Sequence, residues 1–104
     1  MKLLIITAVK ECSKSVEKIL KEASVSVFSV TDTMGVKNSP DDYILDDWFG
    51  SDDGNKYDSV FIFSFCKDEA ANHALSLIDA FNAKESENEF PIRAFIVPVE
   101  NSTK

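Results

Sequence analysis

The sequence predicts a single α+β domain in which four β-strands form an antiparallel sheet and two helices lie on one of its faces. Three observations support this prediction. Four apolar segments have the length and residue types of strands, and two further segments repeat apolar residues at helical spacing. The chain has 104 residues, which is long enough for one hydrophobic core and too short for two.

The first half of the chain supplies a strand, a helix and a second strand. Residues 1–9 (MKLLIITAV) form an apolar run of strand length. Residues 11–23 repeat apolar side chains at helical spacing, and we expect Ser13 or Ser15 to cap this helix. Residues 24–33 (SVSVFSVTDT) alternate between polar and apolar side chains, which predicts the second strand.

The second half of the chain begins with a long polar connection over residues 34–56. Residues 57–66 (YDSVFIFSFC) are the strongest strand of the sequence. Asp68 is a good N-cap for a helix over residues 68–83, because a carboxylate suits the positive end of the helix dipole. After a polar turn, residues 91–99 (PIRAFIVPV) predict the fourth strand.

The resulting order, βαββαβ, is that of the ferredoxin-like fold, and right-handed crossovers place both helices on one face of the sheet. The predicted strands are nevertheless apolar on both faces. In the third strand, Phe61, Phe63 and Phe65 alternate with Val60 and Ile62. We therefore expect the second face to pack against further copies of the chain in a homo-oligomer. The alternative is that residues 34–56 cover this face within one subunit.

The charge and the ends of the chain exclude several classes of function. The formal net charge is −7, and six aspartates lie between residues 41 and 53. No basic face is visible, so nucleic-acid binding is not expected. The apolar start is too short to span a bilayer and lacks a signal-peptide cleavage site, which predicts a cytoplasmic protein without membrane insertion. Cys12 and Cys66 are expected to be free thiols at opposite ends of the sheet.

Two short motifs carry a family resemblance. Residues 30–35 read VTDTMG at the end of the second strand, and residues 95–100 read FIVPVE in the fourth strand. Together with the order of elements, these motifs resemble the PII signalling superfamily. The resemblance implies a trimer whose sheets face a central core. It also makes residues 34–56 the equivalent of the family's T-loop, which engages a partner protein such as a transporter or an enzyme.

The chain departs from the pattern of this family in three places. Residues 35–39 read GVKNS where typical members have Gly-Phe-Gly-Arg-Gln. Residues 84–90 contain no glycine where the family has a glycine-rich phosphate loop, and residues 101–104 contain none of the expected arginines. Backbone amides that cradle phosphates need glycine for close approach, so ATP binding in the family's manner is not expected. We expect the effector to be another small molecule or an ion.

The predicted topology brings the connection after the second strand and the turn before the fourth strand to the same end of the sheet. We expect a cleft at this end, between subunits, to bind the effector. The residues expected to line it are Thr31, Gly35, Lys37 and Lys56, with Glu85 and Glu87 opposite.

Residues 39–50 (SPDDYILDDWFG) predict a short helix with one apolar side. Tyr43, Trp48 and Phe49 are expected to dock on a partner protein or on a neighbouring subunit. Asp42 and Asp46 are four residues apart and could instead hold a divalent cation through their carboxylate oxygens. In that alternative the chain is a CutA-like divalent-metal-binding or metal-tolerance protein.

Catalysis is not expected from this sequence. His73 is the only histidine, and we predict it on the surface of the second helix. No Ser-His-Asp or Cys-His arrangement can be proposed for acid–base or nucleophilic chemistry. A small enzyme of the dimeric ferredoxin-like group is therefore the least favoured of the three interpretations.

Overall fold

The computed structural model describes residues 1–36, 56–84 and 91–103, and of residues 35, 36, 56 and 57 it describes the backbone. In chain order the elements are β1 (Lys2–Val9), a 3₁₀ turn η1 (Lys10–Cys12), α1 (Ser13–Glu22), β2 (Ser29–Val36), β3 (Lys56–Cys66), α3 (Asp68–Lys84) and β4 (Arg93–Pro98). The four strands form one antiparallel sheet in the order β2-β3-β1-β4.

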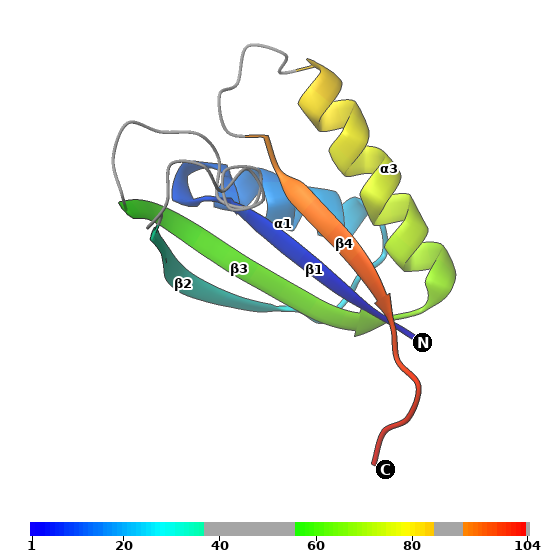
Figure 1. Cartoon of the computed structure of the whole chain (residues 1–104). Coiled ribbons are helices and arrows are strands. Elements are labelled where there is room, and N and C mark those ends of the chain that lie inside the picture. The colour runs from blue at the N-terminus through cyan, green and yellow to red at the C-terminus, as the bar shows by residue number, and fades with distance from the viewer. Residues whose placement is uncertain (37–55, 85–90, 104) are drawn as a thin grey trace, which may run out of the picture.

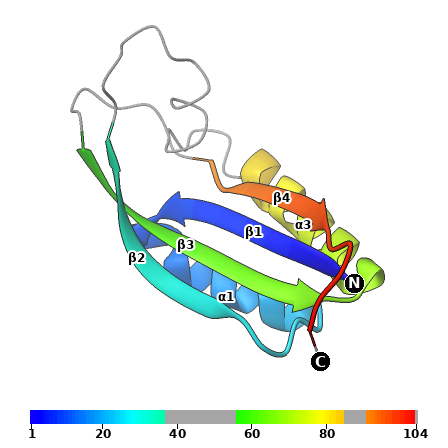
Figure 2. The ribbon, with the colours of Figure 1, turned by 60° about the horizontal axis from the view of Figure 1, so that its bottom comes forward.

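This arrangement confirms the predicted α+β, ferredoxin-like fold. Both α1 and α3 pack against the same face of the sheet (Figure 1), and the view in Figure 2 shows them behind it. We call the face under the helices the closed face and the opposite one the open face. None of the described helices covers the open face.

The hydrophobic core lies between the closed face and the two helices. Its most deeply buried side chains are Leu4 and Ile6 from β1, Val60 and Ile62 from β3, Val16 and Leu20 from α1, Ala74 and Ile78 from α3, and Ile92 just before β4. Burying an aliphatic side chain of this size contributes roughly 1.5–3 kcal/mol. Burial of these side chains explains why the two amphipathic helices pack on the closed face.

The two ends of the sheet differ in what they carry. At one end, which we call the hairpin end, β1 finishes at Val9, β2 finishes at Val36 and β3 begins at Lys56. At the other, which we call the amino end, β1 begins at Lys2 opposite Cys66 of β3. The connection from β2 to β3 and the one from α3 to β4 both leave from the hairpin end.

The second strand begins at Ser29, whereas the sequence predicted its start at Ser24. The reason is the way α1 ends. The Val25 amide donates to the Leu20 carbonyl at 2.9 Å and the Ser24 amide donates to the Lys21 carbonyl at 3.2 Å, which is the Schellman pattern. Ser24 takes the left-handed conformation that this motif needs, with φ of 65°. Ser24 and Val25 therefore belong to the helix cap, and β2 begins only after them.

The predicted caps of both helices are helical residues in the structure. Ser13 already has helical dihedral angles, φ −54° and ψ −46°, because the 3₁₀ turn η1 leads directly into α1. The N-cap position is Cys12, which makes no side-chain capping bond. In α3, which begins at Asp68, the Ala71 amide donates to the Lys67 carbonyl at 3.0 Å, so Lys67 holds the N-cap position and Asp68 lies in the first turn.

The end of α3 is tied to the start of β4 by one side chain. The Asn82 amide nitrogen Nδ2 donates to the Ile92 carbonyl at 2.8 Å, and the Ile92 amide donates back to Asn82 Oδ1 at 3.0 Å. Two bonds from one side chain hold this backbone in a fixed position beside the helix. They also fix where Arg93, the first residue of β4, enters the sheet.

Candidate functional site

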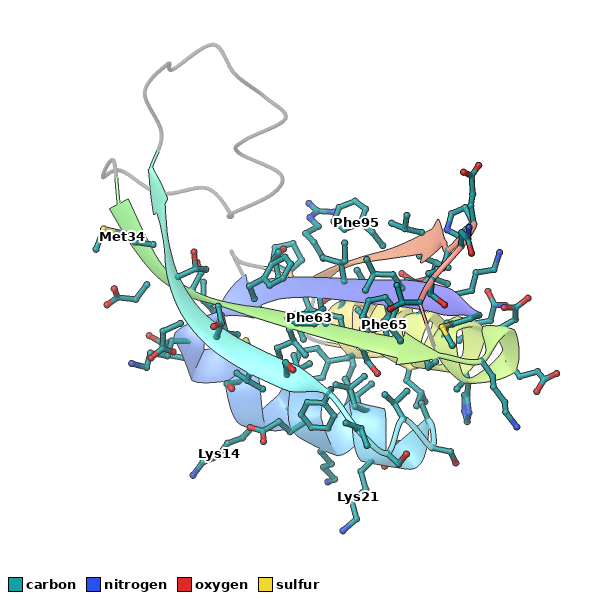
Figure 3. All side chains as sticks on the ribbon, turned by 90° about the horizontal axis from the view of Figure 1, so that it is seen from below. Lys14, Lys21, Met34, Phe63, Phe65 and Phe95 are labelled. Carbon is teal, nitrogen blue, oxygen red and sulfur yellow. The ribbon has the colours of Figure 1, made fainter. Side chains whose placement is uncertain are left out.

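The open face carries the alternate residues of each strand. Those of β3 include Phe61, Phe63 and Phe65, whose successive ring centroids lie 5.9 and 6.4 Å apart. Phe65 is 57% exposed, and Phe95 and Val97 on β4 are each 40% exposed. Figure 3 marks Phe63 and Phe65 along β3 and Phe95 on β4. The face is apolar and uncovered by the described elements, as the two-sided pattern of the strands predicted.

The register of the sheet divides this open face into two halves. Towards the amino end, two successive rows contain only apolar residues of β4, β1 and β3. These rows, which we call the apolar half, are Val97, Leu3 and Phe65, then Phe95, Ile5 and Phe63. Residues that share a row in antiparallel strands lie about 5 Å apart, so the six side chains form one continuous surface. The alternative cover for this surface, residues 34–56, lies largely outside the described residues.

Towards the hairpin end, the next two rows of the open face are mostly polar. One row holds Arg93, Thr7, Phe61 and Thr31, and the following row holds Val9, Ser59 and Thr33. We call the five polar residues of these rows, Thr7, Thr31, Thr33, Ser59 and Arg93, the polar half. Thr7 and Ser59, from the two central strands, are each 2% exposed. Within the described part of the chain, the Ser59 hydroxyl has no hydrogen-bond partner.

Three of the residues predicted to bind the effector lie on β2 and β3. Thr31 is exposed and belongs to the polar half, and Gly35 and Lys56 stand at neighbouring positions of the last two β2–β3 pairs. The structure thus brings Gly35 and Lys56 together at the hairpin end, whereas Thr31 pairs with Phe61 in the middle of β3. Lys37 follows β2 but lies outside the described residues, as do Glu85 and Glu87.

The residues predicted for partner docking and for metal binding also lie outside the described residues. They are Tyr43, Trp48 and Phe49 for the partner and Asp42 and Asp46 for the cation. In residues 1–36, 56–84 and 91–103, no group of three or more His, Cys, Asp or Glu side chains could hold a metal ion. Among the helices of these same ranges, neither is long and apolar enough to cross a membrane.

A groove at the amino end was not predicted from the sequence. It has a volume of about 620 Å³ and lies between the residues after α1, the last residues of β3 and the first turns of α3. Its lining includes Val25, Ser26, Cys66, Glu69 and His73. The residues of the Schellman cap and the segment after it form one wall of the groove. The Ser64 hydroxyl then donates to the Val27 carbonyl at 2.6 Å and holds the rim in place.

The groove contains one of the two cysteines, and both are free, as predicted. Burial raises the pKa of the Cys66 thiol, and the nearby Asp68 carboxylate raises it further, while the amino-terminal ammonium group opposes them. That ammonium group lies 3.8 Å from Asp68 Oδ1. A raised pKa keeps the thiol protonated near neutral pH, which makes Cys66 a poor nucleophile. His73 is exposed, as predicted.

Comparison with known proteins gives structural matches only. No protein-family model matches the chain, and no curated protein sequence matches it. The fold is found in the crystal structure of a "putative PII-like signaling protein" from Thermus thermophilus. The two chains are 14% identical, the match covers 91% of this chain and 82% of that one, and the TM-score is 0.58.

The chain has a PII-like fold. This finding agrees with the resemblance carried by VTDTMG and FIVPVE. In all, 145 chains of solved structures match, which is expected of a widely used fold. An identity of 14% establishes the fold alone, so the function of a PII-like fold in this chain must be argued from its own residues.

Proposed function

We propose that this chain is a PII-like regulatory protein that forms a homo-oligomer and has no catalytic role. It senses a small molecule or ion at the hairpin end of the sheet and engages a partner protein through residues 34–56. The observation that carries the proposal is the apolar half of the open face. A regulatory trimer of the PII-like kind needs such a face on every subunit, whereas a monomeric protein does not.

The exposed aromatic rings support association. Phe65, Phe95 and Val97 are 57%, 40% and 40% exposed on one continuous surface. Soluble monomers rarely leave a large contiguous apolar patch uncovered, and aromatic residues at the centre of an interface contribute most of its binding energy. The family resemblance implies three copies with their sheets facing inward, which would bury this surface.

The position of the hairpin end supports the sensing role. Gly35 and Lys56 lie where β2 ends and β3 begins, and residues 37–55 connect these two strands. Thr31 lies four residues before Gly35 on β2. A ligand bound here would therefore touch both roots of the connection that we propose as the partner-binding element. A ligand shifts a conformational equilibrium only through contacts that differ between the two states, and this location provides such contacts.

Size-exclusion chromatography with light scattering tests the oligomer. We expect a mass of three times the 11.6 kDa of one chain. Phe95→Glu, which places a charge in the apolar half, should convert the oligomer to monomers. Val30→Glu is the matched control, because Val30 is 43% exposed but pairs with Ile62 in the register of the closed face. A wild-type protein that elutes as a monomer at all concentrations would contradict the proposal.

A thermal-shift screen tests the sensing role. Nucleotides, bicarbonate, amino acids and divalent cations are added one at a time to the wild-type oligomer. We expect at least one compound to raise the melting temperature through binding to the native state, and Thr31→Val to reduce this shift. Ser29→Val is the control on the same strand, since Ser29 lies in the row of Phe63 rather than in the polar half. A screen without any shift would leave a protein-interaction module and contradict sensing.

A further inference from the structure

The polar half of the open face contains an unexplained hydroxyl group. Ser59 lies on the central strand β3, is 2% exposed, and its Oγ has no hydrogen-bond partner among the described residues. Buried polar groups are almost always paired, because a lone one gives up its bonds to water without compensation. An orphaned hydroxyl in a native fold therefore points to a partner beyond the described residues, which a bound ligand can supply.

The side chains around Ser59 indicate what kind of partner that is. Thr33 lies directly opposite Ser59 on β2, and Thr7 lies one row away on β1, opposite Arg93. Directly opposed residues are about 5 Å apart and diagonal ones about 7–8 Å, so Ser59 neighbours both Thr33 and Thr7, and Thr7 neighbours Arg93. The set consists of hydroxyls and a guanidinium group, all of which donate hydrogen bonds.

No carboxylate of β2 or β3 with a described side chain shares this surface. Asp32 pairs with Val60 and Asp58 pairs with Met34, and both aspartates fall in the register of the closed face. Arg93 and Thr7 each take part in another interaction already. A guanidinium group has five N–H donors, however, and a hydroxyl both donates and accepts, so both can serve a further partner. A surface rich in donors and lacking acids favours an acceptor that is negatively charged.

We propose that Ser59, Thr7 and Arg93, flanked by Thr31 and Thr33, bind a small oxyanion on the open face. The ligand chemistry is that of a phosphate, sulfate or carboxylate group, either as a free anion or as the anionic group of a larger molecule. Arginine suits this task because its planar fork matches two oxygens at once. The inference rests on the proposed function, since it names the chemistry of the effector at the hairpin end.

The site lies on the surface that faces other copies in the proposed oligomer. Bringing several Arg93 side chains towards one another costs electrostatic energy, which a bound anion reduces. Binding of the anion and assembly of the oligomer should therefore be linked, each favouring the other. This linkage gives the polar half a regulatory role that a merely structural cluster of hydroxyls does not have.

Calorimetry on the full chain tests the proposal. Inorganic phosphate, sulfate, bicarbonate and acetate are added at constant ionic strength, with chloride as the reference anion. We expect at least one of them to raise the melting temperature by about 3 °C or more and to bind saturably in a titration. Arg93→Gln should weaken that binding by about tenfold or more, which is the usual effect of losing one charged hydrogen bond.

Ser59→Ala distinguishes a binding hydroxyl from a structural one. Removing an unpartnered hydroxyl should raise the melting temperature of the anion-free protein and at the same time weaken anion binding by about tenfold. Ser29→Ala is the matched control, since Ser29 faces Phe63 in the next row, and we expect it to leave anion binding unchanged. If Ser59→Ala lowers the melting temperature and leaves anion binding intact, the hydroxyl is structural and the proposal is wrong.

A second set of titrations distinguishes a free anion from the anionic group of a larger compound. A nucleoside monophosphate and a dicarboxylic acid are compared with phosphate and acetate at equal concentration. Tighter binding of a larger compound that is lost in Arg93→Gln assigns the site to the anionic group of that compound, whereas equal binding assigns it to the free anion. Saturable binding by neither the anions nor the larger compounds overturns the inference.

Light scattering on the same samples separates this inference from the proposed function. An oligomer that binds no oxyanion contradicts the anion site and leaves the oligomer standing. A monomer that binds an oxyanion through Arg93 and Ser59 supports the site and contradicts the proposed assembly.

Discussion

Successive residues of β3 face two different environments. Val60 and Ile62 are 1% and 0% exposed, because α1 and α3 cover them, whereas Phe65 on the other face is 57% exposed. These three residues are comparably apolar. Their hydrophobicity therefore does not reveal which face of the sheet is covered by helices of the same chain. The difference teaches that one face stabilises the fold of the subunit, and the other is available for contacts between molecules.

The largest effect should come from the closed face. Ile62→Ala is expected to lower the free energy of unfolding by about 3–4 kcal/mol, because it leaves a cavity in a core that the helices cannot refill. Urea denaturation measures this loss. The control is Ile62→Val, with an expected loss of about 1 kcal/mol. A loss below that of the valine variant would mean that the closed face is not the principal core.

The next largest effect should come from the open face, as a change in the association constant of the proposed oligomer. Phe65→Ala is expected to weaken assembly of the proposed oligomer by about 30-fold, or ~2 kcal/mol, as the loss of an aromatic residue from an interface does. Sedimentation equilibrium over a range of concentrations measures it. In the dissociated subunit, the same substitution should change the free energy of unfolding by less than about 1 kcal/mol. A destabilised subunit with unaltered assembly would place Phe65 in the core rather than in an interface.

A smaller effect tests the boundary between α1 and β2. Ser24→Gly should raise the free energy of unfolding by about 1 kcal/mol, because Ser24 has φ of 65° and glycine adopts that conformation without a steric penalty. Ser26→Gly is the matched control, expected to be neutral or destabilising, since the positive φ is confined to Ser24 among the described non-glycine residues. Equal changes in thermal denaturation of both variants would rule out the Schellman cap as the cause.

The smallest effect is a pH dependence at the amino end. In a Cys12→Ser background, alkylation of Cys66 should have its midpoint at a pH above the ordinary thiol pKa, because burial and Asp68 both raise the pKa of Cys66. Asp68→Asn should move the midpoint to lower pH. Because the raised pKa belongs to the folded state, the associated stability is present below the unfolded pKa and is lost as the pH rises through the folded pKa. If Asp68→Asn leaves the pH midpoint of alkylation unchanged, the Asp68 carboxylate does not raise the pKa of Cys66.

Much of the fold could be predicted because its signals are local or periodic. The β3 and α3 segments show strong strand and helix periodicities, and the acidic residues Asp68 and Glu69 mark the first turn of α3. The first residue of β2 could not be predicted, because residues 24–28 have strand-like alternation and only the hydrogen bonds of Val25 and Ser24 override it. The 3₁₀ turn before Ser13 likewise has no clear sequence signal.

The candidate site was only partly predictable, since it depends on the register of the sheet. Thr31 was found through a motif at the end of a strand. Thr7, Ser59 and Arg93 come from three further segments, and a shift of one residue in any pairing would turn their side chains to the closed face. Long-range register is fixed by packing of the whole domain. A sequence pattern can suggest that both faces are used, but it cannot say which residues share a row.

The paired hydrogen bonds between Asn82 and Ile92 have a mechanical consequence. They join the start of β4 to the end of α3, so the Arg93 side of the hairpin end is stiff. On the opposite side, β2 is an edge strand held by β3 alone, and therefore more compliant. A ligand that bridges Ser59 and Thr33, which lie directly opposite each other, would restrain the compliant strand β2. Because β2 leads into residues 37–55, this restraint would act at the start of that connection.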